Sequence, residues 1–147
     1  MDKQERIDYT AWANEWTSIA RLHRIYHYAG PWDAPVVIIG PSDKGRNVPF
    51  TTVRGTEFAW RSLGTIALLV GWAYTREIPP QSLRSRDGII TCGESAAKWV
   101  KYHVDGEAQL LHIPSPKYLL TRCEDPEVTT VYESVRHFVE NLIRKEG

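Results

Sequence analysis

Two loops, separated by about seventy residues, carry the side chains best suited to chemistry. The first follows the apolar run at residues 36–39 and contains Gly40, Ser42, Asp43, Lys44, Arg46 and Phe50. The second follows the apolar residues 110–111 and contains His112, Ser115, Lys117 and Arg122. A carboxylate or an imidazole can transfer protons or position water. Hydroxyl and cationic groups can hold phosphates, and an aromatic ring can stack on a nucleobase.

The first loop combines a glycine with a large aromatic residue. Gly40 permits a sharp turn and lets a ligand come close to the backbone, because glycine has no Cβ atom. Phe50 follows Pro49 in a polar stretch, and two explanations for it stay open. Its ring can be a platform on which a base stacks, worth about 1–3 kcal/mol, or it can fold back into the core. The loop lacks the GxxxxGK[ST] pattern of a phosphate-binding loop.

The second loop is stiffened by two prolines. Ser115, Lys117 and Arg122 add a hydroxyl group and two cations to it. A rigid loop with such donors can hold a phosphodiester or wedge into a duplex. The alternative is an ordinary proline-rich surface turn. A lone histidine such as His112 is more often structural than catalytic, although the end of a strand is a favourable place for a ligand-binding residue.

These loops must be positioned by strands that alternate with helices. We expect strands at residues 35–40, 72–75, 88–92 and 108–112, and helices at residues 9–28, 55–70, 93–103 and from Pro126 onward, with Asp125 as its N-cap. The alternation predicts an α/β fold of three layers, α/β/α, around a four-stranded, mainly parallel sheet. In such a sheet the loops after the strands gather at the carboxyl edge, where ligands bind.

The composition is that of one globular domain spanning residues 1–147, with the first helix packing on the sheet. Hydrophobic residues make up 42% of the 147 residues, which excludes a disordered chain. No apolar run approaches the roughly 18 residues needed to span a bilayer, and the first residues are polar, so we expect a cytoplasmic protein and no membrane partner. The formal net charge of zero argues against a histone-like partner. The stretch from residue 40 to residue 122 is richer in Lys and Arg than in Asp and Glu, which is compatible with a nucleic-acid face.

The cysteine and histidine content gives no sign of a metal or another cofactor. Cys92 and Cys123 are too few for a thiolate-only iron–sulfur cluster, which needs four. A disulfide is not expected in the cytosol. His23 and His27 lie four residues apart on the predicted first helix, but the sequence shows no third ligand. We therefore expect no metal and no cofactor.

The chain from about residue 36 to its C-terminus resembles the uracil-DNA glycosylase superfamily. The stretch from Gly40 to Phe50 resembles the water-activating loop of that family and the base-stacking aromatic residue that follows it. Residues 90–93, with the alanines at 96–97, resemble its third strand and the small-residue start of the next helix. The Pro-Ser-Pro sequence at 114–116 resembles the loop that pinches DNA.

The resemblance implies an enzyme that flips a nucleotide out of single- or double-stranded DNA and hydrolyses the N-glycosidic bond of an unusual or modified base. The transition state is a sugar cation facing a base anion, so water must be positioned and the leaving base stabilised. The implied roles are Asp43 for the water, His112 for the leaving base, Gly40, Ser42 and Phe50 for the base, and Lys44, Arg46, Ser115, Lys117 and Arg122 for the DNA.

Two departures from the family pattern keep other functions open. The family histidine directly precedes the Pro-Ser sequence, where this chain has Ile113, so His112 should point to the opposite face of its strand. The family also reads uracil with an asparagine after its second strand, and residues 72–76 contain none. One alternative is an inactive module with the glycosylase fold that binds DNA, a nucleotide or a protein partner. Another is an N-glycosidase that acts on free nucleosides or nucleotides.

Overall fold

The computed structural model describes residues 2–41, 48–75 and 78–146. Its strands are β1 (Tyr28–Ala29), β2 (Val36–Gly40), β3 (Gly71–Tyr74), β4 (Gly88–Cys92) and β5 (Gln109–Ile113). Its helices are α1 (Lys3–Leu22), α2 (Val53–Leu63), α3 (Glu94–His103), α4 (Pro116–Thr121) and α5 (Pro126–Glu146), with 3₁₀ turns η1 (Gly64–Leu69) and η2 (Pro80–Leu83). The strands form one mixed sheet in the order β1-β3-β2-β4-β5.

The sheet confirms the α/β class and corrects its predicted details. Strands β3, β2, β4 and β5 are parallel neighbours, as the alternating pattern predicts. The predicted number of four strands is wrong, because β1 adds a fifth strand that pairs with β3 in antiparallel orientation and makes the sheet mixed. The sequence-based prediction of a helix over residues 9–28 missed this strand. The helix in fact ends at Leu22, and Arg24 and His27 then take positive φ angles of 60° and 55° that reverse the chain. His27 therefore does not share a helical face with His23.

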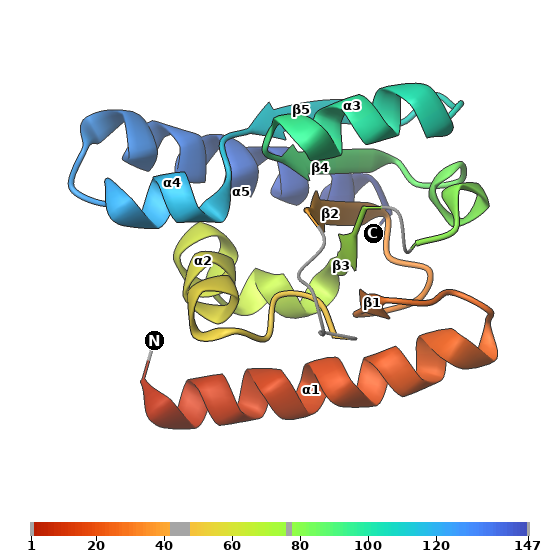
Figure 1. Cartoon of the computed structure of the whole chain (residues 1–147), viewed down its shortest axis with the longest axis horizontal. Coiled ribbons are helices and arrows are strands. Elements are labelled where there is room, and N and C mark those ends of the chain that lie inside the picture. The colour runs from red at the N-terminus through yellow and green to blue at the C-terminus, as the bar shows by residue number, and fades with distance from the viewer. Residues whose placement is uncertain (1, 42–47, 76–77, 147) are drawn as a thin grey trace.

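Two hydrophobic clusters pack on opposite faces of the sheet, because side chains alternate along each strand. On β2, Val36 and Ile38 belong to the larger cluster and Val37 and Ile39 to the smaller one. The larger cluster includes residues of α2, α5 and the first half of α1, and the smaller one includes residues of α3 and the end of α1. Figure 1 shows α1 beside β1 and α3 beside β4 and β5. Helices therefore cover both faces.

Two of the expected helical and loop segments divide differently in the structure. The predicted helix at 55–70 begins earlier and is interrupted at Gly64, whose φ of +58° ends α2 before the 3₁₀ turn η1. The proline-rich stretch after β5 contains a short helix, α4, where a loop was expected. Ser115 is its N-cap and accepts a hydrogen bond from the Tyr118 N–H at 3.3 Å, with Pro116 as its first residue. Serine followed by proline is a known signal for a helix start.

The last helix begins as the sequence predicts. The Asp125 carboxylate accepts a hydrogen bond from the Glu127 N–H at 3.2 Å, and Pro126 is the first helical residue. Helix α5 then packs against α2 and the sheet. In the described part of the chain, no helix combines the length and the apolar character needed to cross a bilayer.

A buried arginine ties together the amino edge of the sheet. Arg86 is 6% exposed and donates hydrogen bonds to the carbonyl oxygens of Trp32 at 2.6 Å, Ala34 at 2.7 Å and Ser82 at 2.9 Å. Its guanidinium also lies 5.4 Å from the ring centre of Tyr28. Burial raises the pKa of Tyr28 to about 12, although the Arg86 charge acts in the opposite direction. This network fixes the turns that lead into β2 and β4.

Candidate functional site

A pocket of about 1020 Å³ lies at the carboxyl ends of β2 and β3. Helices α2 and α4 pack against each other (Figure 1), and residues of both helices and of the loops before them also line the pocket. The described residues that line it are Gly40, Pro41, Phe50, Thr52, Val53, Arg54, Gly55, Glu57, Arg61, Tyr74, Ser115, Pro116, Lys117 and Leu120. Both loops singled out in the sequence therefore meet at one pocket, at the predicted edge of the sheet.

Phe50 forms part of the pocket wall and is itself almost wholly buried. The residue is 6% exposed, and its ring centre lies 4.8 Å from that of Trp72 and 6.3 Å from that of Tyr74. The ring also lies so close to Gly40 that a Cβ added there would be 2.8 Å from the Phe50 Cζ atom. The sequence left open whether Phe50 is a base-stacking platform or part of the core, and the structure shows that it packs in the core. The stacking of a base against the remaining exposed edge stays a prediction.

The backbone between Phe50 and α2 is held tightly. Phe50 has a φ of +59°, which L-residues adopt at a cost. Thr52 is the N-cap of α2, and its hydroxyl oxygen accepts a hydrogen bond from the Gly55 N–H at 2.9 Å. Gly55 packs directly on this turn, since an added Cβ would lie 2.8 Å from the Cα atom of Phe50. The first turn of α2 is thereby fixed beside the pocket.

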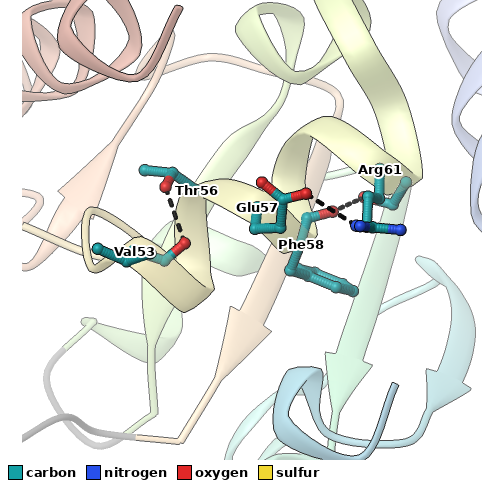
Figure 2. Close-up of polar contacts among 6 residues, drawn as sticks. Val53, Thr56, Glu57, Phe58 and Arg61 are labelled. Atoms are coloured by element: carbon teal, nitrogen blue, oxygen red, sulfur yellow. Dashed lines mark hydrogen bonds and ion pairs between the residues drawn. The ribbon is translucent and has the colours of Figure 1, made fainter. Parts of the chain in front are cut away.

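Helix α2 brings an ion pair to the pocket. The Glu57 carboxylate accepts a hydrogen bond from the Nε atom of Arg61 at 2.8 Å, one turn along the helix (Figure 2). This hydrogen bond raises the pKa of the Arg61 guanidinium above its usual value. Two further cations, Arg54 on α2 and Lys117 on α4, line the same pocket and are exposed. Neither forms an ion pair within the described part of the chain.

His112 is not among the residues that line the pocket. It is exposed on β5, and its Nδ1 atom lies 3.1 Å from the Thr91 hydroxyl oxygen on β4. Ile113, the next residue, is 3% exposed and belongs to the larger cluster on the opposite face of the sheet. The predicted direction of His112, opposite to that of Ile113, is confirmed.

The other predicted site residues divide into three groups. Gly40, Phe50, Ser115 and Lys117 line one pocket. Arg122 lies outside that lining, with its guanidinium 4.7 Å from the ring centre of Tyr118. Ser42, Asp43, Lys44 and Arg46 fall outside the described residues.

Sequence reasoning missed the polar face that α2 turns to the pocket. Arg54, Glu57 and Arg61 are spaced by three and four residues, which places them on one side of a helix. That spacing is ordinary for a solvent-exposed helical face. The sequence held one signal that this face could line the site, namely that these residues directly follow the first candidate loop.

No described group of three His, Cys, Asp or Glu side chains is arranged to hold a metal ion. The two cysteines differ in their surroundings, since Cys92 is buried and Cys123 is exposed. Burial raises the pKa of the Cys92 thiol well above its usual value, so this thiol stays protonated and unreactive. The described lining of the pocket offers hydroxyl, carboxylate, cationic and aromatic groups.

The sequence was compared with models of known protein families and with curated proteins. No family model matches the chain, and no curated protein matches its sequence. The interpretation of the pocket therefore depends on the residues that line it and on their chemistry.

Proposed function

We propose that this chain is a uracil-DNA glycosylase-like protein that takes an unusual or modified base of DNA into the pocket and hydrolyses its N-glycosidic bond. One observation carries the proposal. The pocket joins the small exposed edges of Phe50 and Tyr74, which are 6% and 5% exposed, to hydroxyl and cationic groups at Ser115, Lys117 and Arg54. A flipped nucleotide presents the matching features, a flat base and flanking phosphates.

The size and position of the pocket support a nucleotide-sized ligand. Pockets for small molecules typically enclose about 300–1,000 Å³, and this pocket encloses about 1020 Å³. It lies at the carboxyl edge of parallel strands, the usual ligand site in open α/β sheets. Phe50 and Tyr74 supply apolar surface for a base, while the cations come from the neighbouring helices α2 and α4.

Hydrolysis requires a group that positions water and a donor that stabilises the departing base. Asp43 is the proposed water-positioning carboxylate, two residues after Pro41, which lines the pocket. The Ser115 hydroxyl is the proposed donor. Its oxygen accepts a hydrogen bond from the Tyr118 N–H, so its own proton is available to an acceptor on the base. Ser115 takes this role in place of His112, which does not line the pocket.

Base release from synthetic DNA tests this proposal. Oligonucleotides that carry uracil, hydroxymethyluracil, other modified pyrimidines or deaminated purines would be incubated with the protein, and abasic sites scored by alkaline cleavage. We expect release of at least one base. Asp43→Asn should slow release about 100- to 10,000-fold, and Ser115→Ala about 100- to 1,000-fold.

His112→Ala provides the matched control, because its side chain lies outside the pocket lining. We expect this variant to release the base at nearly the wild-type rate. Release that survives both the Asp43 and the Ser115 substitutions would show that these residues do not perform the reaction. Suppression by His112→Ala alone would return the leaving-base role to the histidine.

A second candidate function is binding without hydrolysis. It is favoured by the place of His112, since the donor that the family resemblance assigns to the leaving base does not line the pocket. Such a module would bind DNA, a nucleotide or a protein partner. Tight binding of an oligonucleotide with no release of any base would select this function. Free nucleosides, assayed in parallel, would detect an N-glycosidase that acts outside DNA.

A further inference from the structure

We infer that the smallest complete ligand of the pocket is a nucleotide, and that Arg54 and Lys117 bind its phosphate. A base or a nucleoside would leave this pair of cations without an anionic partner among the described residues. The inference rests on the proposed function and adds to it that one phosphate is bound jointly by Lys117 and by Arg54, a residue that the sequence did not single out.

The two cations reach the pocket from different helices. Arg54 is the second residue of α2, and Lys117 is the second residue of α4. Both residues line the pocket and both are exposed. Helices α2 and α4 pack against each other and lie close together in Figure 1. Both side chains therefore line one pocket, and in this proposal they contact the same phosphate.

The charges of the described residues that line the pocket favour an anion. Arg61 also lines the pocket, but its guanidinium is paired with the Glu57 carboxylate at 2.8 Å, as Figure 2 shows. That pair adds no net charge. Arg54 and Lys117 have no carboxylate partner among the described residues. An anion bound in the pocket would be attracted by both cations.

The two side chains suit a phosphate in complementary ways. A guanidinium can donate two parallel hydrogen bonds to phosphate oxygens, whereas an ammonium acts as a compact point charge. In the same pocket, the exposed edges of Phe50 and Tyr74 offer apolar surface for a base. The volume of about 1020 Å³ leaves room for the sugar between these two regions.

The phosphate can belong to a free nucleotide or to a DNA strand, and the test separates these sources. Dissociation constants would be measured for three kinds of probe. These are the deoxynucleosides of uracil, thymine, cytosine, adenine and guanine, their monophosphates, and single-stranded oligonucleotides that carry each base. For any base that binds, we expect the monophosphate to bind at least about tenfold tighter than the nucleoside, since charged hydrogen bonds exceed neutral ones in strength.

Arg54→Gln and Lys117→Gln should each remove most of this preference and leave the affinity for the nucleoside unchanged. The matched controls are Arg136→Gln on α5 and Lys101→Gln on α3, two exposed cations outside the pocket lining. Both controls should keep the preference. With an oligonucleotide, Arg54→Gln should also flatten the dependence of affinity on salt by about one unit of charge, whereas Arg136→Gln should not.

Each other outcome has a defined meaning. Equal affinity for nucleoside and monophosphate, or a preference that survives both pocket substitutions, would overturn the phosphate assignment even if base release proves the proposed function. Binding of monophosphates without binding of oligonucleotides would support the phosphate site and contradict the DNA function. Failure of every probe to bind would overturn the phosphate assignment, whereas the proposed function would then be decided by base release from DNA that carries the modified bases.

Discussion

Replacement of Phe50 gives a sharp test of how the pocket wall is built. The side chain is 6% exposed and contacts the rings of Trp72 and Tyr74. Truncation of a buried phenylalanine to alanine typically costs about 3–5 kcal/mol of stability. We therefore expect Phe50→Ala to lower the free energy of unfolding by about that amount, which a residue on a solvent-exposed loop would not do.

The positive φ of Phe50 adds a prediction about the order of two variants. At +59° an alanine keeps the strain of the left-handed region, whereas a glycine does not. Phe50→Gly should therefore be less destabilised than Phe50→Ala by about 1 kcal/mol. Phe58 is the matched control, since it is also fully buried but lies inside α2. There the order should reverse, because glycine in a helix interior costs about 1 kcal/mol more than alanine.

Urea unfolding of the four variants, followed by circular dichroism, measures both effects. The difference between the glycine and alanine variants at Phe50 should have the opposite sign to that at Phe58. A Phe50→Gly protein as unstable as Phe50→Ala, or more so, would refute the assignment of a strained turn. A loss below about 1 kcal/mol in Phe50→Ala would refute its burial.

Two further predictions concern the buried network at the amino edge of the sheet. Arg86→Met should lower the free energy of unfolding by more than about 3 kcal/mol, since each hydrogen bond from a charged group is worth about 1.5–3 kcal/mol and three carbonyl oxygens lose their donor. Urea unfolding would measure this loss. The control Arg84→Met, at an exposed neighbouring position, should change the free energy of unfolding little. The pKa of Tyr28 is raised from 10.0 to about 12 in the folded protein. The protonated hydroxyl therefore makes its full contribution to the free energy of unfolding below pH 10, and this contribution should fall by about 2–3 kcal/mol as the pH rises to 12. The difference between wild type and Tyr28→Phe across this pH range isolates that loss, and Tyr102→Phe, at an exposed tyrosine, should leave the decline unchanged.

The strands that form the parallel part of the sheet were predictable from the sequence. Strand β4 matches its predicted range, and β2, β3 and β5 differ from theirs by one residue at one or both ends. Strands β2, β3 and β4 are short apolar runs bounded by turn residues, which is the signature of a buried strand. Strand β5 lies at the edge of the sheet, and three of its five residues are exposed. Strand β1 was not predictable in this way. It has only two residues, and what makes it a strand is its pairing with β3 rather than any local pattern.

The candidate site was predictable in its position and less so in its composition. Gly40, Phe50, Ser115 and Lys117 meet because parallel strands bring their following loops to one edge. The direction of His112 followed from the alternation of side chains along β5. Arg54 was missed because a polar helical face normally indicates solvent. That it faces a pocket depends on the packing of α2 against α4, which the sequence of α2 alone does not contain.

The most direct test of the central claim asks whether a base of DNA enters this pocket. The affinity of the protein for an oligonucleotide that carries the preferred base would be compared with that for the same strand with an abasic site at that position. Val53 lines the pocket and is 62% exposed, so Val53→Trp can fill the pocket without disturbing the core. Ile7→Trp, at an exposed position on α1 outside the pocket lining, is the control. We predict that the base adds about 1–3 kcal/mol of affinity, that Val53→Trp abolishes this difference, and that Ile7→Trp retains it. Equal affinity for the two strands, or a difference that survives Val53→Trp, would contradict the account.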